Sequence, residues 1–184
     1  MGPMMAPEAP AAIFYSNLVT DPCTGFKYDT NNGFLLIGPN NCGIPGSTQW
    51  LSQPFVSKAT GPVTRVMLSV TNWGICTPTS NKFTVAIYSD NCTGLPSAQI
   101  GNAVVATSPA APPSLASANF GNAGVSLVAG TKYWVVVTTS TAANQVGTTA
   151  VWWEATTSIE DYNFNDGNGW NFGPLGGPGA FQVQ

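Results

Sequence analysis

Apolar and polar residues alternate in several short runs of this 184-residue chain, and this pattern constrains the fold more than any other feature. The runs lie at residues 63–71, 83–88, 133–138, 151–153 and 181–184. Alternation at every second residue is typical of a β-strand with one buried face. No stretch of ten or more residues combines the 3.6-residue period of a helix with a capping residue. The sequence therefore predicts an all-β fold.

Clusters rich in Asn, Gly and Pro separate these runs, for example at residues 31–33, 38–41 and 90–94. These residue types are typical of turns. Short strands joined by such turns predict a two-sheet antiparallel β-sandwich of the jelly-roll or immunoglobulin-like type. We expect residues 1–11, rich in Pro and Ala, to form an extended tail, and residues 12–184 to form a single sandwich domain. Within that domain, residues 107–119 are expected to be an irregular crossover or binding loop.

Charged side chains make up only 7% of the chain, against about 25% in an average globular protein. The absence of His excludes a Ser-His-Asp triad, a Cys-His pair and an imidazole metal site. Five Lys and Arg residues are too few to neutralise a nucleic-acid backbone. No apolar run approaches the roughly 20 residues that span a bilayer. We therefore expect neither a nucleic-acid partner nor direct membrane insertion.

The four cysteines, an even number, allow three disulfide pairings. We expect Cys23–Cys42 and Cys76–Cys92, because each closes a local loop, and each would stabilise the domain by about 3 kcal/mol. Disulfides form in oxidising compartments, so we expect a secreted protein, either extracellular or at the cell surface. Residues 1–10 lack the basic and apolar regions of a signal peptide, and we expect that such a peptide has been removed.

The middle of the chain carries a recognisable order of motifs. A strand that ends in Tyr88-Ser89-Asp90 leads into Gly94-Leu95-Pro96, and after a long connection come Leu127-Val128-Ala129-Gly130-Thr131-Lys132-Tyr133-Trp134 and then Ala150-Val151-Trp152-Trp153. Over residues 62–155 this order resembles the choice-of-anchor R type of bacterial exported domains. The resemblance implies a β-sandwich on a secreted or surface-attached protein, and it implies no shared catalytic site.

Catalysis by paired carboxylates, as in glycosidases, needs two carboxyl groups about 5 to 9.5 Å apart. Glu154, with Glu160 or Asp161, is the one candidate pair beside aromatic residues. We interpret Glu154 as the solvent-facing end of a strand and residues 160–161 as part of a turn. The sequence therefore predicts no catalytic residue and no enzymatic activity.

Residues 161–169 place oxygen-bearing side chains at alternate positions. Calcium binds carboxylate and amide oxygens, so the candidate calcium ligands are Asp161, Asn163, Asn165 and Asp166. The spacing departs from that of an EF-hand loop. The alternative is an Asx-rich turn whose side chains bond to their own backbone. We therefore expect that no cofactor is required, with calcium as an optional ligand.

Six tryptophans are many for a chain of this length. Exposed Trp rings beside amide side chains are how sugar-binding sandwiches hold pyranose rings, and Trp170 lies in an Asn- and Gly-rich segment suited to such a platform. Adjacent Trp152 and Trp153 must face opposite sides of a strand, and alternation groups Trp153 with Val151. The candidate ligand-binding residues are Trp170, Trp152, Asn163 and Asn171. The alternative is that all six rings fill the core or cover its ends.

These features predict a non-catalytic extracellular β-sandwich that attaches to a surface or recognises a glycan or matrix partner. The alternative is a self-assembling structural subunit of an extracellular filament or coat, because a surface with little charge favours self-association. In that case the N-terminal tail and the following residues Ile13–Tyr15 would add a strand to the sheet edge of a neighbouring copy.

Overall fold

A computed structural model describes residues 11–18, 20, 25, 27–38, 48–72, 81–121, 124–139, 149–156, 162–173 and 178–184. These residues contain strands and turns but no helix, so within them the all-β prediction is confirmed. Accordingly, no helix long and apolar enough to cross a membrane occurs in the described ranges. The strands are β1 (Tyr15–Ser16), β2 (Gly33–Ile37), β3 (Trp50–Val56), β4 (Gly61–Pro62), β5 (Arg65–Leu68), β6 (Val70–Asn72), β7 (Lys82–Asp90), β8 (Pro96–Thr107), β9 (Ala116–Asn119), β10 (Ser126–Leu127), β11 (Lys132–Thr138), β12 (Thr149–Trp153), β13 (Asn163–Asn165), β14 (Trp170–Phe172) and β15 (Phe181–Val183).

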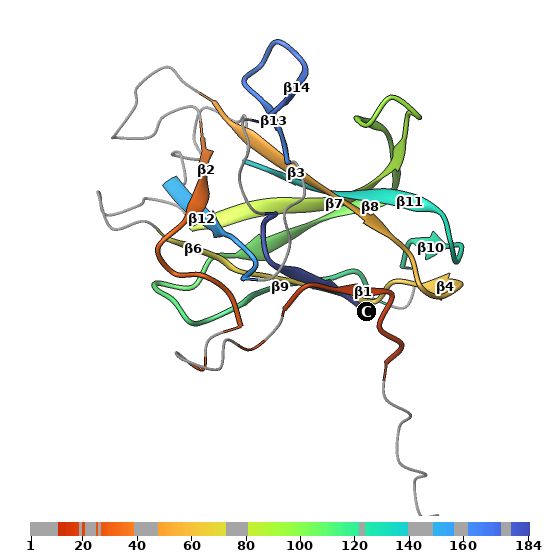
Figure 1. Ribbon diagram of the computed structural model, residues 1–184, viewed down its shortest axis with the longest axis horizontal. Coiled ribbons are helices and arrows are strands. Elements are labelled where there is room, and N and C mark those ends of the chain that lie inside the picture. Colours follow the sequence, from red (N-terminus) through yellow and green to blue (C-terminus); the bar gives the residue numbers. More distant parts are fainter. Residues whose placement is uncertain are drawn as a thin grey trace, which may run out of the picture.

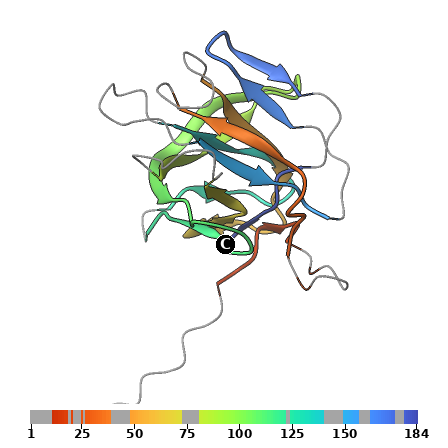
Figure 2. The same ribbon diagram turned by 90° about the vertical axis from the view of Figure 1, so that its left-hand side faces the viewer.

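The strands form several antiparallel sheets (Figures 1 and 2). The largest has six strands in the order β14-β13-β3-β11-β7-β8. The others have the orders β1-β15-β5-β9, β2-β12-β6 and β10-β4. This arrangement is compatible with a β-sandwich.

The alternating run at residues 63–71 divides into two strands that belong to different sheets. β5 pairs with β15 and β9, whereas β6 pairs with β12. Ser69 lies between them: its backbone N–H donates to the carbonyl of Ala180 at 3.1 Å, and its own carbonyl accepts from the N–H of Trp153 at 3.1 Å. The Ser69 hydroxyl contacts the Trp153 and Ala180 carbonyls at 2.8 and 2.9 Å. These bonds join the three-stranded and four-stranded sheets into one layer.

The core lies between this layer and the six-stranded sheet, whose core-facing side we call its inner face. The ring of Phe181 on β15 lies 4.8 Å from Tyr15, 6.0 Å from Phe55 and 5.9 Å from Trp152, measured between ring centroids. These four rings come from β15, β1, β3 and β12. Three sheets therefore share one aromatic cluster, which fixes their packing.

The N-terminal segment expected to serve a neighbouring copy is part of this domain's own fold. Phe14 is 2% exposed, and Tyr15 pairs with Val183 in the register of β1 and β15. Figure 1 shows β1 beside the C-terminal end of the chain. Adding these residues to another copy would require β1 to leave its own sheet. Residues 1–10, most of the expected tail, lie outside the described residues.

The connection at residues 107–119 contains a strand and is not wholly irregular, which corrects the sequence expectation. β9 begins at Ala116 and pairs with β5 over four residues. Ala116 and Ala118 face the core and are 1% and 0% exposed. Their small side chains gave the alternation too little contrast for a strand to be recognised.

Candidate functional site

Two tryptophans and one asparagine stand in a row at one end of the six-stranded sheet. β13 pairs with both β3 and β14, and its register places Asn165 opposite Trp50 on one side and Trp170 on the other. Residues directly opposite one another point to the same face of a sheet. Trp50, Asn165 and Trp170, which we call the aromatic row, are each partly exposed. Two strand spacings separate the tryptophan backbones by about 10 Å.

The aromatic row lies on the outer face of the sheet, opposite to the core. The inner face of β3 presents Leu51 and Phe55 to the core cluster, so Trp50, with the opposite parity, points outward. Figures 1 and 2 show β13 and β14 projecting beyond the body of the domain. The row therefore occupies a projecting hairpin and the strand to which it is attached.

The turn of this hairpin is held by its own side chains. Asn165 Oδ1 accepts hydrogen bonds from the backbone N–H groups of Gly167 and Gly169, at 2.8 and 3.4 Å. Asp166 Oδ1 accepts from the N–H of Asn168 at 3.1 Å. The φ angles of Gly167 and Gly169 are +100° and +117°, a conformation that favours glycine. The alternating oxygens noted in the sequence therefore serve an Asx-type turn.

Three of the four predicted calcium ligands, Asn163, Asn165 and Asp166, lie in the described residues. Asp161 lies outside the described residues. Asn163 is 1% exposed, and its amide nitrogen donates to the Gly94 carbonyl at 3.0 Å, while Asn165 and Asp166 cap the turn. Across the residues that the structure describes, no group of three or more Cys, Asp or Glu side chains is placed to hold a metal ion.

Next to the aromatic row lie buried polar atoms without hydrogen-bond partners. Asn163 Oδ1, Ser52 Oγ and Trp50 Nε1 are such atoms within the described part of the chain. Asn163 and Ser52 are directly opposite each other, and each lies two residues along its strand from a member of the aromatic row, Asn165 on β13 and Trp50 on β3. An unmet buried donor or acceptor costs about 1–3 kcal/mol. This part of the outer face therefore has hydrogen-bonding capacity that the fold itself does not use.

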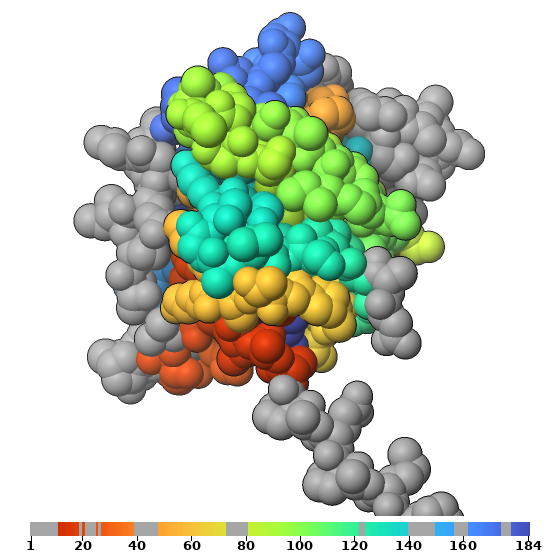
Figure 3. Space-filling view, turned by 90° about the vertical axis from the view of Figure 1, so that its right-hand side faces the viewer, coloured from red at the N-terminus to blue at the C-terminus, as the bar shows by residue number. Residues whose placement is uncertain are grey.

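The connection between β7 and β8 folds over the outer face and reaches the hairpin. The Gly94 carbonyl accepts from Asn163, although β7 and β13 are separated by β11 and β3 in the sheet. Gly94 also lies close to the Phe172 ring, which a Cβ at position 94 would meet at 3.5 Å. The space-filling view shows the lime residues of this connection against the blue residues of the hairpin (Figure 3).

Asp90 anchors this connection to the sheet. Its Oδ1 accepts from the indole N–H of Trp134 at 2.8 Å and lies 3.4 Å from Lys132 Nζ, and its Oδ2 accepts from the N–H of Cys92 at 2.8 Å. Partial burial alone would raise the pKa of Asp90, but these hydrogen bonds and the Lys132 charge outweigh it and lower the pKa. Trp134 is 2% exposed, so its ring supports the connection and is not a ligand platform.

The other predicted ligand residues are placed very differently. Asn171 is exposed on β14, and its amide nitrogen donates to the Gly169 carbonyl at 3.1 Å. The expectation of an accessible Trp152 ring is corrected, because Trp152 is 0% exposed and its indole N–H donates to the Ala180 carbonyl at 3.1 Å. Its neighbour Trp153 faces the other way and donates to Thr71 Oγ1 at 2.7 Å. Alternation separated the two rings correctly but assigned the wrong one to the outside.

The predicted carboxylate pair and disulfides fall largely outside the described residues. Glu160 and Asp161 are not described, and Glu154 forms an isolated bridge with Gly179. Cys23, Cys42 and Cys76 are also not described. Cys92 is exposed and is not in a disulfide in this structure. The pairing therefore stays a prediction.

No protein-family model matches this chain, and no curated protein sequence matches it significantly. The similarity to choice-of-anchor R domains therefore stays a hypothesis that depends on the motifs alone.

Proposed function

We propose that this chain is a non-catalytic extracellular recognition domain that binds a glycan through Trp50, Asn165 and Trp170. The observation that carries the proposal is the aromatic row, in which two partly exposed indole rings flank an amide on one face of the sheet. The predicted platform residue Trp170 is part of this row. Trp50 was not among the predicted ligand residues, and the register of β3 brings it there.

The chemistry of the row suits a sugar. An indole ring presents a flat apolar surface with a polar N–H at its edge, and a pyranose ring presents C–H groups on its faces and hydroxyl groups around its rim. The neighbouring unpartnered atoms include both a donor, Trp50 Nε1, and an acceptor, Asn163 Oδ1, but both are buried, so a sugar would reach them only if the side chains around them moved. Hydroxyl groups can serve both kinds of atom because each is a donor and an acceptor. None of the three row residues is charged, so stacking and neutral hydrogen bonds dominate the expected recognition.

The sequence supports a proposal for the fold type and the cellular location of this domain. We propose a jelly-roll or immunoglobulin-like sandwich with local disulfides Cys23–Cys42 and Cys76–Cys92, on a secreted or surface-attached bacterial protein. The low content of charged residues and the even number of cysteines support this proposal. The domain requires no cofactor, and calcium is at most an optional ligand.

Self-assembly through the N-terminal segment is the less favoured function. Its residues Phe14 and Tyr15 already pack and pair within the domain. The long edge strand β8 is interrupted by register shifts opposite Val85–Ile87 and Tyr88–Asp90. Such irregularities blunt an edge and oppose pairing with another copy. These features of β1 and β8 therefore do not favour a filament built through either of these two edge strands.

The test is binding to immobilised polysaccharides followed by titration of soluble fragments, read by tryptophan fluorescence. Trp170→Ala is expected to weaken binding at least tenfold while the melting temperature stays within about 2 °C, because the partly exposed ring lies on the projecting hairpin and not in the core cluster. Trp170→Phe should recover part of the affinity because it restores an aromatic face. Val128→Ala, at a side chain that is 56% exposed outside the row, is the matched control. Equal binding by wild type and Trp170→Ala would refute the proposal.

A further inference from the structure

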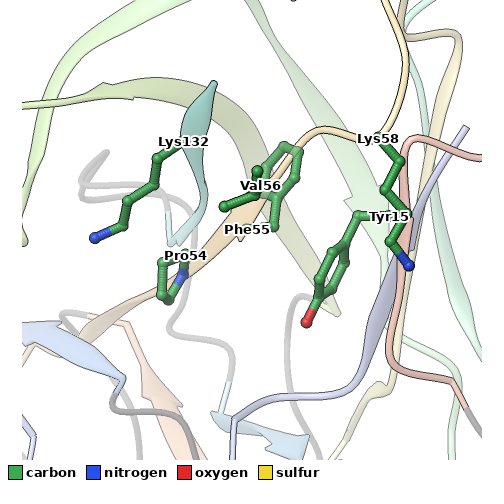
Figure 4. A pocket seen from close by; sticks show the side chains of 6 residues that line it. All are labelled: Tyr15, Pro54, Phe55, Val56, Lys58 and Lys132. Carbon is green, nitrogen blue, oxygen red and sulfur yellow. The ribbon is translucent and has the colours of Figure 1, made fainter. Parts of the chain in front are cut away.

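A pocket of about 360 Å³ lies at the other end of β3 from the aromatic row. Its lining residues are Tyr15, Pro54, Phe55, Val56, Lys58 and Lys132. In Figure 4 the apolar and aromatic side chains lie between the two lysines, and the Lys58 side chain runs beside Tyr15. The pocket thus combines an apolar wall with two cationic groups.

The charge around this pocket is unlike that of the chain as a whole. The chain carries a formal net charge of −3 and has only five Lys and Arg residues, two of which line the pocket. No lining residue is acidic. Lys132 is partly neutralised, since its Nζ lies 3.4 Å from Asp90 and 4.8 Å from the centre of the Trp134 ring. Lys58 is exposed and forms no ion pair with any described residue.

The apolar wall is held rigidly. The Tyr15 and Phe55 rings lie 5.7 Å apart and both contact the Phe181 ring. The backbone N–H of Lys58 donates to the Phe14 carbonyl at 2.8 Å, which fixes the start of its side chain beside β1. Phe55 is 3% exposed, so a ligand would meet a preformed surface made chiefly by Tyr15, Pro54 and Val56, and only the outer part of the Lys58 side chain would have to be ordered.

Pro54 and Trp50 point to the same face of β3, and four residues of strand separate them by about 13 Å. Pro54 and Val56 line the pocket from this face, whereas Phe55 faces inward. An oligosaccharide that runs along β3 from the aromatic row would therefore reach the pocket from its Pro54 side. Pro54 lacks a backbone N–H to give to a further strand, and the described pairing of β13 with β3 ends at Ser52. No described residue of β13 therefore pairs with β3 beside the pocket, and side chains form the pocket lining.

We propose that this pocket is a second subsite that receives a hexuronic acid unit of the glycan, with its carboxylate at Lys58 and its C–H face against the apolar wall. This inference rests on the proposed function and adds the class of sugar. A neutral sugar would pack against the apolar wall but would form no ion pair with Lys58. A bare inorganic anion would form an ion pair with Lys58 but would make no apolar contact with the wall.

The experiment compares an oligomer of hexuronic acid with its carboxyl-reduced form, a neutral glycan of the same length and linkage. The wild-type chain should bind the acidic form about three- to fivefold more tightly at low salt, since an exposed charge pair contributes modestly and is screened by salt. Lys58→Gln should abolish this difference and leave binding of the reduced form unchanged. Lys27→Gln, at another exposed lysine, should preserve the difference.

The outcomes separate this inference from the proposed function. If both forms bind equally to wild type and both are lost in Trp170→Ala, the glycan function stands and the hexuronic acid subsite is refuted. If neither form binds to wild type, both proposals fail for this class of sugar. Competition by inorganic phosphate as strong as that by free hexuronic acid would reduce the pocket to a general anion site and also overturn the assignment.

Discussion

Replacing Asp90, the last residue of β7, by Ala should destabilise the domain markedly. The carboxylate holds the β7–β8 connection over the outer face through Trp134, Lys132 and Cys92. Removing it leaves the indole N–H of Trp134 without its acceptor in a residue that is only 2% exposed. The same change also releases the connection that carries the Gly94 carbonyl to Asn163.

The expected loss can be worked out from these contacts. A hydrogen bond from a buried donor to a charged acceptor contributes about 1.5–3 kcal/mol. The Lys132 side chain is 39% exposed, so its ion pair adds less than about 1 kcal/mol. The bond to the Cys92 N–H lies in an exposed turn and adds about 0.5 kcal/mol. We therefore expect Asp90→Ala to lose about 3 kcal/mol, which for a chain of this size lowers the melting temperature by about 6–12 °C at neutral pH.

The matched control is Asp29→Ala. Asp29 also accepts bonds within its own turn, from Asn31 N–H at 2.7 Å and from Asn32 Nδ2 at 2.8 Å, but both of these contacts are exposed. Its replacement should cost less than about 1 kcal/mol. Thermal unfolding followed by circular dichroism and urea unfolding at the same pH would give both losses.

The pH dependence tests whether the charge is responsible. The pKa of Asp90 is lowered on folding, so its contribution is fully present above the ordinary Asp pKa of about 3.9 and is lost as the pH falls through the folded value. The gap between wild type and Asp90→Ala should therefore be constant from neutral pH to about pH 5 and narrow below about pH 4. A gap no larger than that of Asp29→Ala, or one that does not narrow in acid, would refute the reasoning.

Three further measurements test other parts of the structure. Gln53 is 1% exposed and neither amide atom has a described partner, so Gln53→Met should stabilise the domain by about 1–2 kcal/mol in urea unfolding, whereas Gln53→Glu should destabilise it. Millimolar calcium should leave the melting temperature where a chelator leaves it, because Asn165 Oδ1 and Asp166 Oδ1 already accept backbone hydrogen bonds in the turn; an upward shift would instead support calcium as the optional ligand. Tryptic peptides mapped without reductant should contain the pairs Cys23–Cys42 and Cys76–Cys92, and four free thiols would contradict the disulfide prediction.

The alternating runs predicted strands well where large apolar residues marked one face. Phe83, Val85 and Ile87 on β7 and Tyr133, Val135 and Val137 on β11 all face the core, as their periodicity indicates. β3 gave no such signal, because the polar Gln53 faces inward between Leu51 and Phe55 while Trp50 and Val56 face outward. The central strand of the candidate site was therefore not recognised from the sequence.

The site itself could be predicted only in part. The composition of the 161–172 segment indicated a turn with an aromatic ring, and both are present in its described residues. The partner of that ring depends on which strand the hairpin joins, and Trp50 lies more than a hundred residues away in the sequence. Likewise, the pocket joins Tyr15 on β1 to Lys132 on β11. Pairing between strands far apart in the sequence forms both the aromatic row and the pocket. Local sequence patterns carry no information about such pairing.

The pairing of β1 with β15 determines how the domain responds when its two ends are pulled apart. The two strands are antiparallel, with Tyr15 opposite Val183, so the chain enters and leaves the domain at the same end of this pair. A force applied between the two ends of the domain would open the pair one bond at a time, instead of shearing all its bonds together. Peeling of β1 would also draw Tyr15 away from Phe55 and dismantle one wall of the pocket. Tension between the ends would therefore disrupt the proposed subsite and one side of the aromatic cluster together.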